Sequence, residues 1–261
     1  MKIEYSAKSV VGLVRERNED AFLCLPEEGL FVVADGMGGH NRGDVASRVC
    51  IDAIRDWFKG KTKAGETVYG GNGIAARHTT KKVSPRKFLA QSITYANQRV
   101  FQASRTVEDL SGMGTTVVAL LVHRGMAFIV NSGDSRAYRL RNKRLCQLTK
   151  DHSLVAEYMR LHLLTKKSAK VFHYRNVIVK ALGLSGEVSF DMHGFHIRDG
   201  DLYLLCSDGL TEMVDDHKLK GLLCRDEDLE VMTDRLVESA LEAGGNDNIT
   251  VVLVRCILKD E

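Results

Sequence analysis

The stretch Thr115–Val130, TTVVALLVHRGMAFIV, decides what kind of sheet the chain can build. Its two apolar runs, Thr115–Val122 and Met126–Val130, are rich in β-branched and aliphatic residues, which is typical of buried strands. Only residues 123–125 separate the runs, and one of them is glycine. A connection this short joins antiparallel neighbours in a hairpin, because parallel strands need a crossover of about a dozen residues. The stretch therefore predicts an antiparallel sheet and argues against a doubly wound parallel one.

Apolar runs of the same kind recur on both sides of this hairpin. Strands are predicted over residues 9–14, 21–25, 29–34, 136–140, 201–206 and 249–256. Apolar residues at helical spacing predict helices over residues 44–58, 85–105 and 229–243, so the helices should be few and long. A sheet with one apolar face must pack on another layer. We therefore expect an α+β fold, a four-layer αββα sandwich in which a central antiparallel β-sandwich is flanked by helices.

The composition is that of a globular protein with little net charge. The chain has 261 residues, of which 44% are hydrophobic, and a net charge of +3, which gives no reason to expect nucleic-acid or membrane-surface binding. No signal-peptide core follows Met1, and no apolar stretch approaches the roughly 18 residues that membrane insertion needs. We expect a cytoplasmic monomer with a single domain over residues 1–261. Six widely spaced cysteines without a C-x-x-C motif are predicted to be reduced core residues: Cys24, Cys50, Cys146, Cys206, Cys224 and Cys256.

Residues 59–87 differ from the rest of the chain in charge and glycine content. Eight basic residues stand against the single acid Glu66, which gives this segment a net charge of +7, and five glycines interrupt it. We interpret the segment as a basic loop insertion between two helices. A solvated surface loop is the plainer interpretation, and a docking patch for an acidic or phosphorylated partner is the alternative.

Four aspartates stand where apolar runs begin or end: Asp35, Asp134, Asp208 and Asp247. A single Asp-Gly pair usually marks a turn, but four aspartates beside buried strands indicate a preorganised site. Two carboxylates about 4 Å apart repel each other by roughly 4 kcal/mol at an effective dielectric constant near 20, so such a cluster needs protons or cations. All-oxygen ligands favour Mg²⁺, Mn²⁺ or Ca²⁺ over Zn²⁺. The pattern predicts a site for hard divalent cations.

A charged cluster near the N-terminus, Arg15-Glu16-Arg17-Asn18-Glu19-Asp20, adds groups suited to phosphate chemistry. A guanidinium is a good bidentate partner for phosphate, and a neighbouring carboxylate can orient a metal-bound water. Alone, the cluster would be interpreted as a solvated loop. Two hard cations a few ångströms apart can activate a water and clamp phosphoryl oxygens.

Taken in order, these segments resemble the metal-dependent protein serine/threonine phosphatases of the 2C type, the PPM family, in its compact bacterial form. The resemblance spans nearly the whole chain, and its specificity comes from the order of the segments, because each one alone is weak. It rests on Gly12-Leu13-Val14-Arg15 with Asn18-Glu19-Asp20, Val33-Ala34-Asp35-Gly36-Met37-Gly38-Gly39-His40 with Gly43-Asp44-Val45-Ala46-Ser47, Gly112-Met113-Gly114-Thr115-Thr116, Asn131-Ser132-Gly133-Asp134-Ser135-Arg136, Thr149-Lys150-Asp151-His152-Ser153-Leu154-Val155, Cys206-Ser207-Asp208-Gly209-Leu210 and Asn246-Asp247-Asn248-Ile249-Thr250.

The resemblance implies a binuclear Mn²⁺ or Mg²⁺ centre in a cleft at one end of the sheets. Asp35 would bridge the two ions, and Gly36 would bind the second ion through its carbonyl oxygen. Asp208 and Asp247 would complete the ligands of the first ion. Asp134, together with Asp208, matches a third and weaker metal site.

The resemblance also implies the substrate and the reaction. Arg15 matches the arginine that holds the substrate phosphate, while Glu19 and Asp20 match acidic residues that bind metal waters or support the metal ligands. The catalytic residues would be Arg15, Asp35 and Asp208. A metal-activated water would attack phosphoserine or phosphothreonine directly, without a phosphoenzyme intermediate. The expected partners are phosphoproteins, including a Ser/Thr kinase that the enzyme opposes.

Two segments leave roles open. Animal members of the family place a histidine after the Asp-Gly pair as a suggested general acid, but this chain has Met37 there, as bacterial relatives commonly do. His40 could act as the acid instead, although packing against or capping the following helix is the favoured role for it. Residues 151–183 resemble the bacterial flap beside the cleft, which favours a mobile substrate-gating element over a plain helix and loop.

Two other functions compete with an active protein phosphatase. A catalytically silent scaffold that binds phosphoproteins would be expected to lack a metal aspartate, yet Asp35, Asp208 and Asp247 are all present. Another two-metal hydrolase, such as a phosphodiesterase, would be expected to carry His-rich metal motifs instead of bare aspartates.

Overall fold

The computed structural model describes the chain except residues 39–41, 61–82, 107, 170, 175 and 259–261. Its strands form two sheets, and all the strand pairs described are antiparallel. The first sheet has the order β1 (Lys2–Val10), β11 (Ile249–Ile257), β10 (Asp201–Cys206), β7 (Arg136–Arg141) and β8 (Arg144–Gln147). The second has the order β2 (Asp20–Leu25), β3 (Leu30–Met37), β5 (Val117–His123), β6 (Met126–Ser132) and β9 (Asp191–His196), with the short β4 (Gly114–Thr115) beside β3.

The hairpin that decides the sheet type is β5–β6. His123 pairs with Met126, so Arg124 and Gly125 form a two-residue turn. Their φ angles are 47° and 76°, and a type I′ turn requires positive φ at both central residues. The predicted antiparallel sheet is confirmed, although the first strand of the hairpin is divided at Thr116, between β4 and β5.

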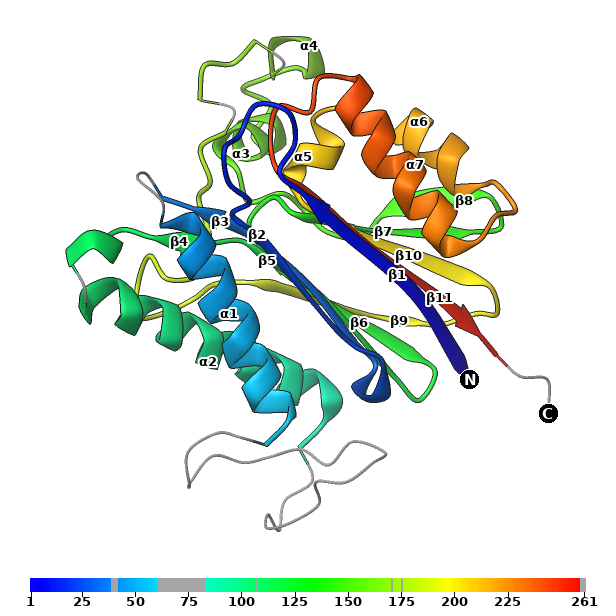
Figure 1. Cartoon of the computed structure of the whole chain (residues 1–261), viewed down its shortest axis with the longest axis horizontal. Helices are drawn as coiled ribbons and strands as arrows, with labels where there is room; N and C mark the ends of the chain where they lie inside the picture. The colour runs from blue at the N-terminus through cyan, green and yellow to red at the C-terminus, as the bar shows by residue number, and fades with distance from the viewer. Residues whose placement is uncertain (39–41, 61–82, 107, 170, 175, 259–261) are drawn as a thin grey trace.

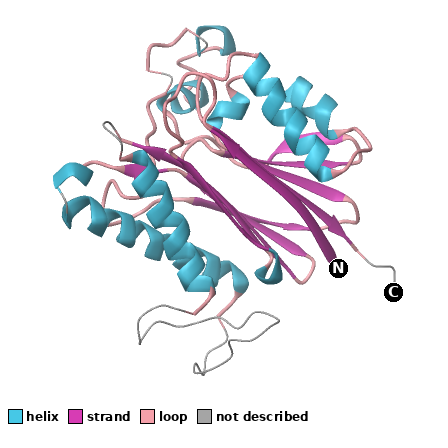
Figure 2. Ribbon diagram, viewed as in Figure 1, coloured by secondary structure: helices cyan, strands magenta, loops and turns pink. Residues whose placement is uncertain are grey.

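Helices cover both outer faces of the sheets (Figures 1 and 2). The second sheet is covered by α1 (Gly43–Phe58) and α2 (Pro85–Thr106), and the first by α6 (Asp216–Leu223) and α7 (Leu229–Glu242). The apolar stripe of α1 packs onto its sheet through residues three and four apart, such as Cys50, Ile54 and Trp57. A third apolar cluster, which includes Phe31 and Tyr203, lies between the sheets. The predicted four-layer αββα sandwich is confirmed.

The expectation of few, long helices is wrong. Besides the helices above, the chain forms the short helices α3 (Leu154–Arg160), α4 (Lys166–Ala169) and α5 (Asp208–Thr211) and two 3₁₀ turns at Pro26–Glu28 and Glu108–Leu110. Elements of one or two turns are too short to display a hydrophobic period, which is why the sequence pattern missed them.

Several predicted strand boundaries are also wrong. The run over residues 9–14 leaves the sheet after Val10, because Gly12 takes φ +83° and passes so close to the carbonyl oxygen of Asp247 that a Cβ there would lie 2.2 Å from it. Asp35 and Gly36 do not follow their strand but lie within β3, which continues to Met37. Strands β8 and β9 were not predicted, since neither carries a β-branched run.

The cysteines are all free thiols, in agreement with the reduced state expected. Cys50, Cys206 and Cys256 are buried, and burial raises the pKa of each thiol to about 12. Cys146, however, is exposed on β8, so the prediction that it is a core residue is wrong. Within the described residues, no helix combines the length and apolar character needed to cross a membrane.

Candidate active site

Two of the acidic residues singled out by the sequence face each other across neighbouring strands. Asp20 is the first residue of β2 and is the direct partner of Asp35 on β3. Like charges placed opposite each other destabilise a sheet, so this pair needs compensation. The hydroxyls of Ser207 and Thr250 donate to Asp20 Oδ2 at 2.7 and 2.6 Å, which leaves Oδ1 without a partner.

The remaining aspartates reach the same end of the sandwich from separate connections. Asp134 lies in the loop between β6 and β7, Asp208 begins α5 directly after β10, and Asp247 lies two residues before β11. Asp35 experiences repulsion from each of these three carboxylates and from Asp20. The structure thus brings these aspartates to one edge of the sandwich, because antiparallel strands alternately begin and end there. Their role as metal ligands stays a prediction.

The clustering changes the protonation of the carboxyl groups. Burial, followed by repulsion from neighbouring carboxylates, raises the pKa of Asp35 and of Asp208 well above the ordinary value. Burial and repulsion by Asp247 and Glu19 raise the pKa of Asp20 to about 7 despite its two hydroxyl partners. Burial and the nearby Asp151 raise the pKa of Asp134 to about 6. The negative charge at this site is thus largely uncompensated by the protein's own cations.

The oxygen atoms of these residues are suitable ligands for a divalent cation, but their side chains do not surround an ion in the present arrangement. Among the described residues, no three Asp, Glu, His or Cys side chains lie close enough together to hold an ion. Yet Asp20 Oδ1 and Asp134 Oδ1 are buried with no hydrogen-bond partner, and a buried carboxylate oxygen without a partner is costly. Carboxylate oxygens of this kind are the ligands that hard divalent cations prefer.

Arg15 and Glu19 are brought to the cluster by the connection between β1 and β2. Arg15 Nη2 donates to Asp247 Oδ2 at 2.7 Å, and this hydrogen bond raises the pKa of the guanidinium. Burial raises the pKa of Glu19, which is also repelled by Asp44 and Asp247. The cluster near the N-terminus is therefore part of the site and not a separate solvated loop.

Asn248 organises this connection, a role that the sequence reasoning missed. Its Nδ2 donates to the carbonyl oxygens of Val11 and Arg17, both at 2.9 Å, and its Oδ1 accepts from the N–H of Glu19 at 2.8 Å. In the Asn246-Asp247-Asn248 motif, the family resemblance implies a role for the aspartate alone. The three backbone partners of Asn248 lie 229 to 237 positions earlier in the chain. This role of the buried amide could therefore be found only from the structure.

Gly36 is required by close packing between β3 and the first turn of α1. A Cβ added at Gly36 would lie 2.0 Å from the Gly43 carbonyl oxygen and 2.6 Å from that of Glu19. The Gly36 N–H donates to the Glu19 carbonyl oxygen at 3.1 Å. The glycine therefore holds the N-terminus of α1 against the strand that carries Asp35.

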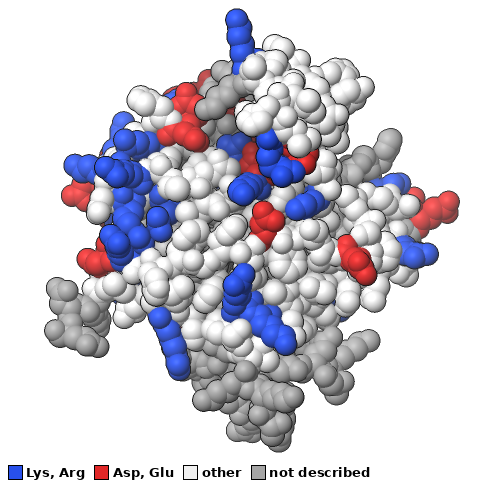
Figure 3. Space-filling view, turned by 180° about the vertical axis from the view of Figure 1, so that it is seen from behind, with Lys and Arg blue, Asp and Glu red and all other residues white. Residues whose placement is uncertain are grey.

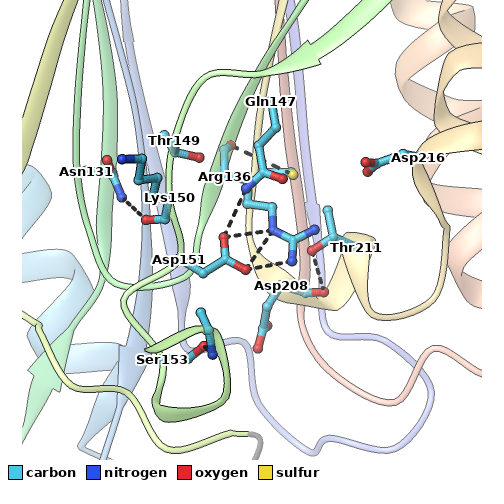
Figure 4. Close-up of polar contacts among 12 residues, drawn as sticks. Asn131, Arg136, Gln147, Thr149, Lys150, Asp151, Ser153, Asp208, Thr211 and Asp216 are labelled. Atoms are coloured by element: carbon cyan, nitrogen blue, oxygen red, sulfur yellow. Dashed lines mark hydrogen bonds and ion pairs between the residues drawn. The ribbon is translucent and has the colours of Figure 1, made fainter. Parts of the chain in front are cut away.

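An ion pair lies beside Asp208 (Figure 4). The Arg136 guanidinium donates to both oxygens of Asp151 at 2.6 to 3.1 Å, and Gln147 Nε2 donates to Asp151 Oδ1 at 3.1 Å. Arg136 and Asp151 line a cavity of about 270 Å³ together with Asp134, Asp208, Glu212 and apolar residues from α3 and α4. One wall of the cavity is thus built by the segment expected to be a flap.

Glu212 is a second residue that the sequence reasoning missed. It lies four residues after Asp208, and its charge raises the pKa of Asp208 and Asp134. Helical spacing after Asp208 could have revealed it. His40, the candidate general acid, and residues 61–82 of the basic insertion lie outside the described residues.

Comparisons with known proteins agree with this architecture. The sequence model of the protein phosphatase 2C family matches residues 14–253. The serine/threonine phosphatase Stp of Listeria welshimeri is 36% identical over 246 residues, which cover 93% of this chain and 92% of the relative. The protein phosphatase PhpP of Streptococcus pneumoniae is 32% identical over 256 residues, 97% of each chain.

A solved structure adds evidence for metal dependence. The crystal structure of the catalytic domain of the serine/threonine protein phosphatase PstP with two manganese ions is 32% identical and has a TM-score of 0.82, covering 98% of this chain and 99% of that one. The chain thus belongs to the protein phosphatase 2C family, as a metal-dependent protein serine/threonine phosphatase.

Proposed function

We propose that this enzyme hydrolyses phosphoserine and phosphothreonine in proteins at the aspartate cluster and so opposes a Ser/Thr kinase. The observation that carries the proposal is the gathering of Asp20, Asp134, Asp208 and Asp247 around Asp35. Among the described residues, only Asp247 of this set has an ion-pair partner, Arg15. In this proposal Asp35, the carbonyl oxygen of Gly36, Asp208 and Asp247 would hold two ions. Asp134 with Asp208 would hold a third ion.

Two Mn²⁺ or Mg²⁺ ions, when bound, would polarise the phosphoryl oxygens and activate the attacking water. The protein's own residues would position the substrate. Arg15 would bind the phosphate through its guanidinium, since it already reaches the cluster at Asp247. Asp20, fixed by Ser207 and Thr250, would support the metal ligands, and Glu19 would accept hydrogen bonds from metal waters.

The remaining structural assignments belong to the same proposal. The enzyme would act as a monomer with one catalytic domain, and residues 151–183 would be the flap that gates substrate access. The cavity between Asp208 and Met159 of α3 supports this role, because the segment already lines the space beside the aspartates.

Phosphate release from a phosphothreonine peptide tests the proposal. We expect turnover with Mn²⁺ and none after EDTA. Asp208→Asn should lower kcat by at least about a thousandfold while the far-UV circular dichroism spectrum stays unchanged, because the variant removes a metal ligand and little packing. Asp226→Asn, an exposed aspartate between α6 and α7, is the matched control and should keep wild-type activity.

Near-normal turnover by Asp208→Asn would contradict the proposed site. A wild-type protein that binds Mn²⁺ and phosphopeptide but releases no phosphate would instead favour the scaffold function.

A further inference from the structure

Basic side chains gather on the face seen from behind, beside β7 and β8 (Figure 3). The chain turns there between the two strands at Asn142 and Lys143, whose φ angles are 50° and 58°. We name this region the β7–β8 basic surface and define it by four residues: Arg139, Arg141, Lys143 and Arg144. It belongs to the described part of the chain and is distinct from the basic insertion over residues 59–87.

Strand register explains why the arginines share a face. Arg141 pairs directly with Arg144 across β7 and β8. Leu140 and Leu145, which also pair, pack into the apolar cluster beneath α6 and α7. Because side chains alternate along a strand, Arg139, Arg141 and Arg144 lie on the opposite face. Two like charges directly opposite each other destabilise the pair of strands unless an anion compensates them.

The protein compensates only part of this charge. Arg141 forms two hydrogen bonds with the buried Asp201, which neutralises that guanidinium. The Arg139 guanidinium lies over the Phe195 ring at 5.6 Å, and its Nε is buried without a hydrogen-bond partner. Among the residues that the structure describes, no ion pair engages Lys143 or Arg144. Three basic side chains are therefore left for an external anion.

We propose that the β7–β8 basic surface binds an acidic segment of the phosphoprotein substrate. The inference rests on the proposed function and adds a specificity element to it. The positive charge of this surface is complementary to aspartate and glutamate side chains. The planar guanidinium of Arg139, which lies over the Phe195 ring, can donate hydrogen bonds to a carboxylate.

The position of the surface sets the spacing of the recognised sequence. Strand β7 leads from Arg136, which lines the cavity beside Asp208, to Arg139 three residues on, about 10 Å at 3.3 Å per residue. Arg139 lies on the opposite face of β7 from Arg136, and Lys143 and Arg144 lie further along the strand direction, at the turn between β7 and β8. An extended peptide advances about 3.3 to 3.6 Å per residue. Carboxylates about four to seven residues from the phosphothreonine would therefore reach the surface, and carboxylates adjacent to it would not.

Steady-state kinetics on three phosphothreonine peptides tests the inference. One carries glutamates four to seven residues from the phosphothreonine, one carries them at the adjacent positions, and one carries glutamines throughout. A small aryl phosphate reports on the active site alone. The variant is Lys143→Glu/Arg144→Glu. Its matched control is Arg99→Glu/Arg105→Glu, which makes the same charge change on the exposed side of α2.

We expect the wild-type enzyme to prefer the distal-glutamate peptide by about tenfold in kcat/KM, mainly through KM. Raising NaCl from about 0.05 to 0.5 M should reduce the preference, because screening shortens the range of surface charge interactions. Lys143→Glu/Arg144→Glu should lose the preference but keep its activity on the glutamine peptide and the aryl phosphate. The α2 control should keep both. Arg139→Gln should lose part of the preference, since it removes one of the three cations.

Equal kcat/KM for the three peptides, or a preference that survives in Lys143→Glu/Arg144→Glu, would overturn the inference. If no substrate is hydrolysed, the proposed function fails, and fluorescence anisotropy with the unphosphorylated distal-glutamate peptide then decides on the surface alone. Salt-sensitive binding of duplex DNA or phosphatidylserine vesicles that the variant abolishes, without binding of the peptide, would assign the surface to another partner and also overturn the inference.

Discussion

At the scale of single residues, the Arg15 guanidinium and the Asp247 carboxylate of the site hold each other in position. Asp247 uses both carboxylate oxygens, Oδ2 accepting from Arg15 and Oδ1 from the N–H of Asn248. Arg15 therefore has an anionic partner in the cluster itself. A substrate phosphate would compete with that carboxylate for the guanidinium, so the affinity for phosphate depends on how firmly Asp247 is held elsewhere.

Arg15→Ala should raise KM for a phosphothreonine peptide by about tenfold or more, with a smaller change in kcat. A charge-assisted hydrogen bond to phosphate contributes about 1.5 to 3 kcal/mol, and its loss from substrate and transition state alike appears in KM. Arg17→Ala removes an exposed arginine two positions away and should leave KM unchanged. An unchanged KM in Arg15→Ala, measured under the same metal concentration, would remove Arg15 from phosphate binding.

At the scale of elements, the connection from β8 to α3 determines where the cavity wall stands. Asp151 is bound by Arg136 of β7 and by Gln147 of β8, and Ser153 two residues later caps α3 by accepting from the Ala156 N–H. The side chains of Arg136 and Asp151 are 27% and 17% exposed, so the pair is partly shielded from water.

Asp151→Asn should lower the free energy of unfolding by about 1 to 3 kcal/mol, because Arg136 would keep its charge without a full partner. Glu157→Gln breaks the exposed pair with Arg160 on α3 and is the matched control, with an expected loss below about 0.5 kcal/mol. Urea denaturation of both variants measures the difference. Equal losses would show that Arg136–Asp151 behaves as an ordinary surface pair.

Elements with their own local signal could be predicted from the sequence. The β5–β6 hairpin and helices α1, α2 and α7 were found because their turn residues or apolar periods lie within the element. Strand β9 was missed because its six residues, DMHGFH, are stabilised by pairing with β6 and not by a local preference. That Asp20 and Asp35 lie directly opposite each other could not be predicted from the sequence either, because it depends on the register between β2 and β3.

At the scale of the whole molecule, the edge where strands of both sheets meet concentrates carboxylates whose repulsion opposes folding. The pKa of Asp20 rises from 3.8 to about 7 and that of Asp134 to about 6 in the folded protein. Between these values and 3.8 the folded state holds protons that the unfolded state has released. The free energy of unfolding then falls as pH increases, because stability decreases with pH wherever the folded state binds more protons.

The metal-free protein should therefore melt at a lower temperature at pH 7 than at pH 5, and Mn²⁺ should reverse this order. A divalent ion requires ionised carboxylates, so the stabilisation it provides grows as pH increases through the raised pKa values. Differential scanning calorimetry with EDTA and with Mn²⁺ at both pH values measures the two effects. Asp35→Asn, which removes one of the repelling carboxylates, should flatten the pH dependence of the metal-free protein and shrink the gain from Mn²⁺. A metal-free melting temperature that increases steadily from pH 5 to pH 7 would mean that groups with the opposite linkage outweigh the aspartate cluster. His123 and His152 are such groups, because burial lowers their pKa and the unfolded state then binds more protons than the folded state.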